Sequence, residues 1–180
     1  MIALTRVLVP TDFSEASEAA VKYGVALARA FNAKLTLLHV VVRHELDVSV
    51  ERQRVVDTLL AEMTAGAAPI GLDESLQRVA RELLGNILSK KDEEELRVDY
   101  VLRASGVGGP YVEIVRYAQE RTIDLIVMGT HGRGFVAHML MGSVAEKVVR
   151  KAPCPVLTVR HPEHEFVIPD EPARHPGRPS

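Results

Sequence analysis

Short apolar runs that alternate with helical patterns constrain the fold of this chain more than any other feature. The runs lie at residues 6–10, 34–41, 98–102, 124–128 and 154–159. Runs that are apolar on both faces are typical of strands that helices cover on either side of a parallel sheet. We therefore expect an α/β fold, with a five-stranded parallel sheet flanked by helices.

Residues at helical spacing fill the segments between these runs. Ser14 is suited to cap the helix after the first run, and Pro110 is suited to the first position of the helix after the third. The buried stripe of the first helix is expected at Ala16, Ala20, Tyr23, Leu27 and Phe31. The charged run KKDEEE at 90–95 is expected to be a solvated segment without a function of its own.

One domain, residues 1–160, accounts for almost the whole pattern. Within it, the segment of about 45–91 is expected to form two helices, separated by the Pro-Gly break in AGAAPIG. The second helix carries an apolar stripe that ends at Leu88. Residues 161–180 hold five of the ten prolines and are expected to form a flexible tail.

Composition excludes several classes of protein. The chain has 22 basic and 24 acidic side chains, so it lacks the charge that nucleic-acid binding requires. Its longest apolar run, LTLLHVVV, is too short to span a membrane, and its first residues do not resemble a signal peptide. A single cysteine excludes an internal disulfide framework. A protein of the cytoplasm fits these observations.

A glycine-rich stretch, GTHGRGFVAHMLMGS at 129–143, follows the fourth apolar run. Ligands of parallel α/β sheets bind beyond the carboxyl ends of the strands, where the strand order reverses. The loops at 10–12 and 129–134, which follow the first and fourth apolar runs, are therefore the expected ligand-binding loops. Without Cβ atoms, Gly129 and Gly132 would let backbone amides line a hollow for an anion, and the helix that opens at Gly142 would present further unpaired amides.

A purely structural interpretation of the same stretch stays open. Glycine after a strand often serves only a tight turn, and Gly132 would permit a positive φ. Ser143 and Glu146 fit a capping box, in which the serine serves its own helix. The G-x-G-x-x-G and G-x-x-x-x-G-K-[ST] signatures of other nucleotide-binding proteins are absent.

Four segments together resemble the universal stress protein family: RVLVPTDFS, LLHVV, DLIVMGTHGRG through MGSVAEKVV, and APCPVLTVR. The spacing G-x2-G-x9-G-[S/T] is similar to the ATP-binding branch of that family. The resemblance covers roughly residues 5–42 and 97–160. It implies a Rossmann-like sheet of the adenine nucleotide alpha hydrolase type, a homodimer through the last strand, and ATP held with Mg²⁺.

The resemblance also implies a role for each matching position. Pro10, Thr11 and Asp12 would lie by the adenosine, Val40 would meet the adenine edge, and Met128 and Gly129 would flank the ribose. Gly132, Arg133, Gly142, Ser143 and Val144 would hold the phosphates, with Mg²⁺ bridging them. The long segment before the third strand and the proline-rich tail depart from the family pattern.

Other candidate residues fit structural roles better than chemical ones. His131 and His138 lack carboxylate or cysteine neighbours at a metal-ligand spacing. His161 and His164 could hold zinc, but they lie in the expected flexible tail. Cys154 begins an apolar run, which favours burial over reactivity.

Three functions are consistent with the sequence. The first is a nucleotide-binding regulatory module that binds ATP and has at most a weak ATPase activity. The second is an enzyme on the same fold, a nucleotide hydrolase or nucleotidyl transferase, in which Asp12 could act as a general base. The third is a dimeric scaffold without a ligand, in which the glycines serve only turns.

Overall fold

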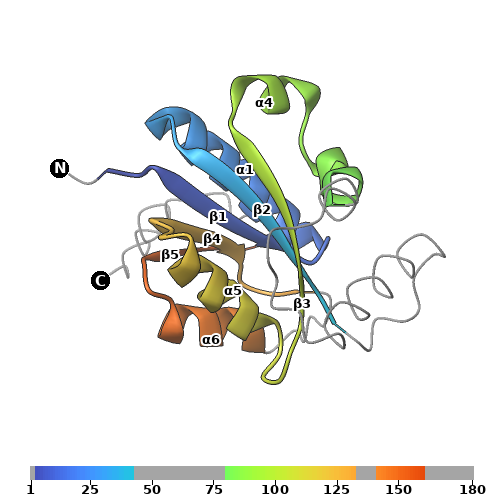
Figure 1. The fold of residues 1–180 in the computed structure, drawn as a ribbon, viewed down its shortest axis with the longest axis vertical. Helices are drawn as coiled ribbons and strands as arrows, with labels where there is room; N and C mark the ends of the chain where they lie inside the picture. The colour runs from blue at the N-terminus through green and yellow to red at the C-terminus, as the bar shows by residue number, and fades with distance from the viewer. Residues whose placement is uncertain (1–2, 43–79, 133–140, 161–180) are drawn as a thin grey trace, which may run out of the picture.

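The structure is a computed structural model that describes residues 3–42, 80–132 and 141–160. Its five strands are β1 (Arg6–Thr11), β2 (Lys34–Val41), β3 (Val98–Ala104), β4 (Leu125–Gly129) and β5 (Val156–Val159). They form one sheet in the order β3-β2-β1-β4-β5, and every neighbouring pair is parallel (Figure 1). This order is the one found in Rossmann-like folds. The predicted fold class is therefore confirmed.

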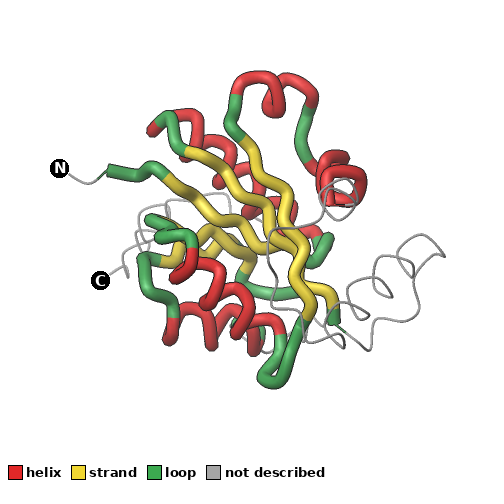
Figure 2. Tube along the Cα trace, viewed as in Figure 1, coloured by secondary structure: helices red, strands yellow, loops and turns green. Residues whose placement is uncertain are grey.

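Helices cover both faces of the sheet. The helical elements within the described residues are α1 (Glu15–Phe31), η1 (Gly85–Ile87), α4 (Lys90–Glu95), α5 (Pro110–Glu120) and α6 (Ser143–Lys151). Helix α1 lies on one face and α5 and α6 lie together on the other, with the strands between them (Figure 2). Because α1, α5 and α6 follow β1, β3 and β4, they begin at the edge where the strands end.

Alternation along β1 divides the core into two layers. Val7 and Val9 are fully buried in the cluster that contains α1 residues such as Ala20. Leu8 is fully buried in the other cluster, with Ile114 of α5 and Val148 of α6. Successive side chains of a strand point to opposite faces, so a strand covered on both sides must be apolar throughout.

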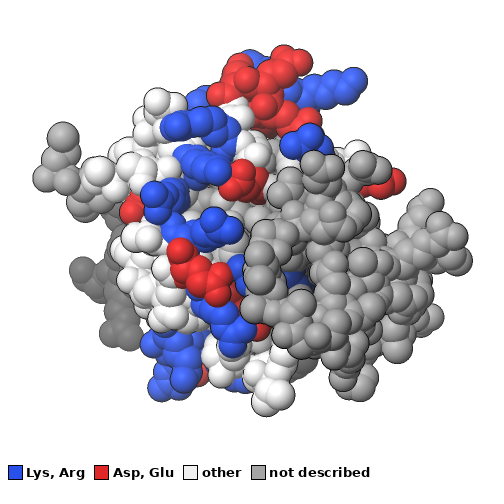
Figure 3. All heavy atoms as spheres, viewed as in Figure 1, with Lys and Arg blue, Asp and Glu red and all other residues white. Residues whose placement is uncertain are grey.

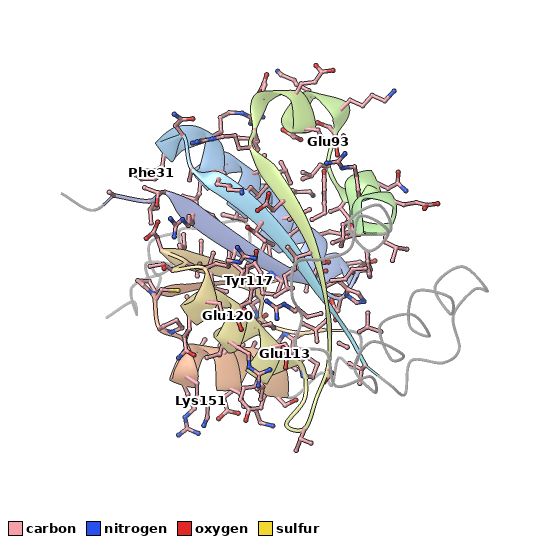
Figure 4. The ribbon with its side chains drawn as sticks, in the orientation of Figure 1. Phe31, Glu93, Glu113, Tyr117, Glu120 and Lys151 are labelled. Carbon is pink, nitrogen blue, oxygen red and sulfur yellow. The ribbon has the colours of Figure 1, made fainter. Side chains whose placement is uncertain are left out.

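The predicted buried face of α1 is partly wrong. Tyr23 and Phe31 are 44% and 48% exposed, and Figure 4 shows Phe31 at the outer edge of the molecule. The helix instead buries small residues, including Ala20, Gly24 and Ala28. A Cβ at Gly24 would lie 2.4 Å from Val9 Cγ2, so α1 approaches β1 too closely for large side chains to lie between them.

The charged run at 90–95 is the helix α4 and not merely a solvated segment. Ser89 caps it, because its side chain accepts a hydrogen bond from the Asp92 amide. Arg29 of α1 forms ion pairs with Asp92 at 2.6 Å and with Glu95 at 3.0 Å. Acidic side chains gather on this helix in Figure 3. The run therefore anchors the segment before β3 to the end of α1.

Most of the expected two-helix segment lies outside the described residues. Residues 80–84 are helical and η1 follows at once, so the regular helix ends before the predicted Leu88. The tail at 161–180 also lies outside the description. Among the described residues, no helix has the length and apolar character to cross a membrane.

A carboxylate fastens the start of β1 beside the start of β4. Asp124 Oδ2 accepts hydrogen bonds from the Thr5 amide and hydroxyl, both at 2.7 Å, and from the Arg6 amide at 2.9 Å. Burial would raise the pKa of Asp124, but these hydrogen bonds outweigh it and hold the pKa below its ordinary value of 3.8.

We expect Asp124→Ala to lower the free energy of unfolding at pH 7 by about 1–3 kcal/mol, because three donors lose a charged acceptor. A lowered carboxyl pKa stabilises the fold above the ordinary pKa, and this contribution is lost as the pH falls through the folded value. Urea unfolding of both proteins between pH 7 and pH 3 should therefore show the difference shrinking toward acid. A difference that stays constant over this range would contradict the assignment.

Candidate functional site

A pocket of about 310 Å³ lies beyond the carboxyl ends of β1, β2 and β4 and between the first turns of α5 and α6. Strand β1 lies between β2 and β4 in the sheet. The chain forms β2 and β3 on one side of β1 and then crosses to the other side, where it forms β4 and β5. The pocket thus occupies the point where the strand order reverses, as expected for an α/β sheet.

Every predicted site residue that the structure describes lines this one pocket. They are Pro10, Thr11, Asp12, Val40, Met128, Gly129, Gly132, Gly142, Ser143 and Val144. Arg133 lies outside the described residues. The structure therefore brings together segments that are more than 100 positions apart in the sequence.

Asp12 is held by the turn that joins β1 to α1. Its Oδ1 accepts hydrogen bonds from the Ser14 amide at 3.1 Å and from the Ser14 hydroxyl at 2.6 Å. Ser14 in turn caps α1 by accepting a hydrogen bond from the Ser17 amide, as predicted. The carboxylate is thus fixed on the pocket wall, and one of its oxygens serves the turn.

The glycines of the motif allow close approach rather than unusual backbone angles. A Cβ at Gly129 would lie 2.8 Å from the backbone oxygen of Ala16 in α1, and a Cβ at Gly132 would lie 2.5 Å from Asp12 Oδ2. The expected positive φ at Gly132 is wrong: within the described residues, the glycines with positive φ are Gly108 and Gly109. Gly129 therefore serves helix packing, and Gly132 keeps the loop against Asp12.

The helix α6 begins one residue earlier than a capping box at Ser143 requires. Gly142 is its N-cap and Ser143 is its first helical residue, and the N-cap glycine has no side chain that could accept a capping hydrogen bond. The Glu146 amide donates to Gly142 O at 2.9 Å, and the Gly142 amide donates to Thr130 O at 2.7 Å. The first amides of a helix have no partner within it, so the start of α6 presents donors to the pocket.

Several lining residues were missed by the sequence argument, among them His39, Pro110, Ile114, Thr130 and His131. His39 is 7% exposed, and its Nδ1 donates to Thr11 O at 2.8 Å. His131 Nδ1 lies 2.9 Å from Thr130 Oγ1. Strand β3 also ends at this edge, and this is the signal that could have indicated a contribution from the following helix. That helix is α5, which supplies Pro110 and Ile114.

Cys154 and the remaining histidines lie away from the pocket or outside the description. Cys154 is half-buried, and burial raises the pKa of its thiol. This result agrees with the expectation of burial over reactivity. His138, His161 and His164 lie outside the described residues.

Known proteins resemble this chain over nearly its whole length. The model of the universal stress protein family matches residues 3–160. The universal stress protein MJ0577 of Methanocaldococcus jannaschii is 32% identical over 163 residues, which cover 86% of this chain and 94% of the relative.

Solved structures of universal stress proteins also resemble this chain. The universal stress protein UspA from Lactobacillus plantarum superposes with a TM-score of 0.58 at 28% identity, covering 88% of this chain and 99% of that one. A universal stress protein in complex with cAMP superposes with a TM-score of 0.55 at 25% identity, covering 88% and 98%.

Proposed function

Because this chain belongs to the universal stress protein family, we propose that it binds ATP with Mg²⁺ and acts in the cytoplasm as a nucleotide-dependent regulatory module of the stress response. The observation that carries the proposal is the convergence on one pocket of Gly132, Asp12 and the start of α6, whose N-cap is a glycine. A structurally similar member of the family, solved in complex with cAMP, supports an adenine nucleotide as the ligand.

The two ends of the pocket suit the two ends of a nucleotide. The bare backbone at Gly132 and the first amides of α6 can donate hydrogen bonds to phosphate oxygens. Val40 and Met128 belong to an apolar core cluster and also line the pocket, which suits the adenosine. In this arrangement Arg133 would neutralise the distal phosphate charge.

The donors on the pocket wall are compatible with Mg²⁺. This ion prefers oxygen ligands and is usually bound through one or two carboxylates together with the phosphates of the substrate. Among the described lining residues, Asp12 carries the one carboxylate. The ion would be held chiefly by the phosphates, whose negative charge it would reduce.

Binding rather than turnover is the proposed activity. Asp12 Oδ1 is occupied by two hydrogen bonds from Ser14, which fits a residue that shapes the turn better than a general base for water. Phosphoryl transfer depends largely on positioning and charge stabilisation. A weak ATPase activity therefore remains compatible with this pocket.

Calorimetric titration of the whole protein with ATP, in the presence and absence of Mg²⁺, tests the proposal, with cAMP as the comparison ligand. We expect ATP with Mg²⁺ to bind more tightly than cAMP, because cAMP offers a single phosphate to the backbone amides. The absence of binding with either ligand would overturn the proposal and favour a dimeric scaffold. Steady release of phosphate that Asp12→Ala abolishes would instead favour a hydrolase.

Ser143→Ala separates ligand binding from helix capping. We expect the variant to bind ATP about tenfold more weakly, a change of about 1.4 kcal/mol, because the exposed hydroxyl at the start of α6 would contact a phosphate. Its free energy of unfolding should stay within about 0.5 kcal/mol of the original protein, because Gly142 and not Ser143 is the N-cap.

Ser89→Ala is the matched control, because Ser89 caps α4 and does not line the pocket. Loss of that cap should cost about 1 kcal/mol of stability. Both variants are compared by urea unfolding and by calorimetric titration. If Ser143→Ala loses stability and keeps its ATP affinity, the phosphate contact is misassigned.

We also propose a homodimer through the last strand. Strand β5 ends the described sheet, and its Leu157 is 37% exposed. Val149 of the neighbouring α6 is 45% exposed. An apolar edge strand is a template for pairing with another chain. Leu157→Lys should therefore shift the mass measured by analytical ultracentrifugation from dimer to monomer, and an unchanged dimer would place the interface elsewhere.

A further inference from the structure

We infer that the first two turns of α5 select the base of the bound nucleotide, with Pro110 and Ile114 forming the wall against which the base lies. This inference rests on the proposed nucleotide function and extends it to residues outside the glycine motif. Pro110 and Ile114 both line the pocket. They are four positions apart, so they lie on the same face of the helix.

A backbone hydrogen bond places the start of α5 beside the end of β2. The Ser105 amide donates to Val41 O at 2.8 Å, which ties the beginning of the β3–α5 connection to β2. The pocket lining includes Val40 and Val42, on either side of Val41. The wall of α5 therefore faces the strand end that is proposed to meet the adenine edge.

The lining residues include an apolar group and a polar group. The apolar group includes Leu38, Val40, Ile114 and Met128, which share one buried cluster, together with Val42 and Pro110. The polar group includes Asp12, Thr130, His131, Gly132, Gly142 and Ser143, which follow β1 and β4 or open α6. The faces of a base are largely apolar, whereas phosphates require donors and positive ends of helices. The base therefore belongs beside the apolar group, against α5.

The wall is continuous with the hydrophobic core, so its side chains are not easily displaced. Ile114 is 3% exposed and belongs to the same buried cluster as Leu38, Val40 and Met128. Close-packed side chains of a protein core resist displacement, and the ring of Pro110 fixes the backbone angle φ at the first position of the helix. A rigid wall of this kind discriminates between ligands by excluding those that do not fit.

The loop before α5 lies beyond the wall and offers a control. Figure 1 shows the connection between β3 and α5 extending past the sheet. Gly108 and Gly109 both have positive φ, and a Cβ at Gly108 would lie 2.7 Å from Val112 Cγ2. Val107 is fully exposed and is not among the lining residues, so its side chain should not affect the choice of base.

Competition against a fluorescent ATP analogue tests the inference, with ATP and CTP as competitors for the whole protein. CTP carries the same triphosphate on a smaller, single-ring base. In Ile114→Phe the added ring should fill the space beside the apolar group, so the ratio of ATP affinity to CTP affinity should fall about tenfold. Pro110→Trp enlarges the wall at a half-buried position, so it provides a second test if Ile114→Phe does not fold. Val107→Ala should leave the ratio unchanged.

The outcomes separate the inference from the proposed function. If the original protein does not bind the ATP analogue, the proposed function fails. If the original protein binds ATP and the ratio stays within about twofold in the folded variants, the selecting wall is overturned while the function stands. An equal loss of both affinities would also overturn it, because a general disturbance of the pocket does not change the choice of base.

Discussion

Gly132→Val is expected to abolish ATP binding and to leave the protein folded. A Cβ at this position would lie 2.5 Å from Asp12 Oδ2, and the two methyl groups of valine would extend farther into the space proposed for the phosphates. Two hydrogen bonds from Ser14 hold the Asp12 carboxylate in place. We expect the affinity to fall by at least about 100-fold, or about 2.7 kcal/mol.

The measurement is calorimetric titration with ATP and Mg²⁺, together with thermal unfolding to verify the fold. Gly106→Val is a matched control, because Gly106 lies in the β3–α5 loop, does not line the pocket and has no atom closer than 3.9 Å to an added Cβ. If Gly132→Val remains folded and binds ATP as the original protein does, the phosphates are not bound at this loop.

Gly129→Ala is expected to destabilise the fold, although it adds a single methyl group. The new Cβ would meet the backbone of Ala16, with its oxygen at 2.8 Å and its carbonyl carbon at 2.9 Å. These atoms belong to the first turn of α1 and cannot rotate away as a side chain can. Overpacking of this kind costs about 1–3 kcal/mol, so the midpoint of urea unfolding should shift to lower urea.

Gly106→Ala is the control for this change as well. Replacement of glycine by alanine in an unstrained loop is neutral or stabilises by about 0.4–1 kcal/mol, because it restricts the unfolded chain. The two variants should therefore move the unfolding midpoint in opposite directions, or Gly106→Ala should leave it unchanged. Equal stability of the Gly129→Ala variant and the original protein would mean that α1 and β4 are not closely packed.

The five-stranded parallel sheet could be predicted from the sequence, because its strands are apolar on both faces and alternate with helical patterns along the chain. Strand β2 has the predicted bounds of 34–41, and every residue of it except Lys34 is buried. The helix faces were harder to predict. Tyr23 and Phe31 have the spacing of a buried stripe, but the close approach of Gly24 to Val9 turns a narrower face of α1 toward the sheet.

The position of the pocket could be predicted because parallel strands all end at one edge of the sheet. Asp12 and Gly132 follow β1 and β4, which are neighbours in the sheet. Pro110 and Ile114 could not be found in this way, because they reach the pocket through the packing of α5 against the sheet. The N-cap at Gly142 could not be predicted either, because the spacing of residues in the sequence does not determine whether the helix begins at Ser143 or one residue later.

The helices α1, α5 and α6 all begin at the same edge of the sheet, and this affects the rate at which a ligand associates. Each helix carries about half a positive elementary charge at its beginning, and the three beginnings surround one opening of a chain whose formal net charge is −2. A polyanion diffusing nearby would therefore be drawn toward the opening before any contact forms, and dissolved ions would weaken this attraction. The association rate constant of ATP should fall as the ionic strength rises, although the molecule as a whole has the same sign of charge as its ligand.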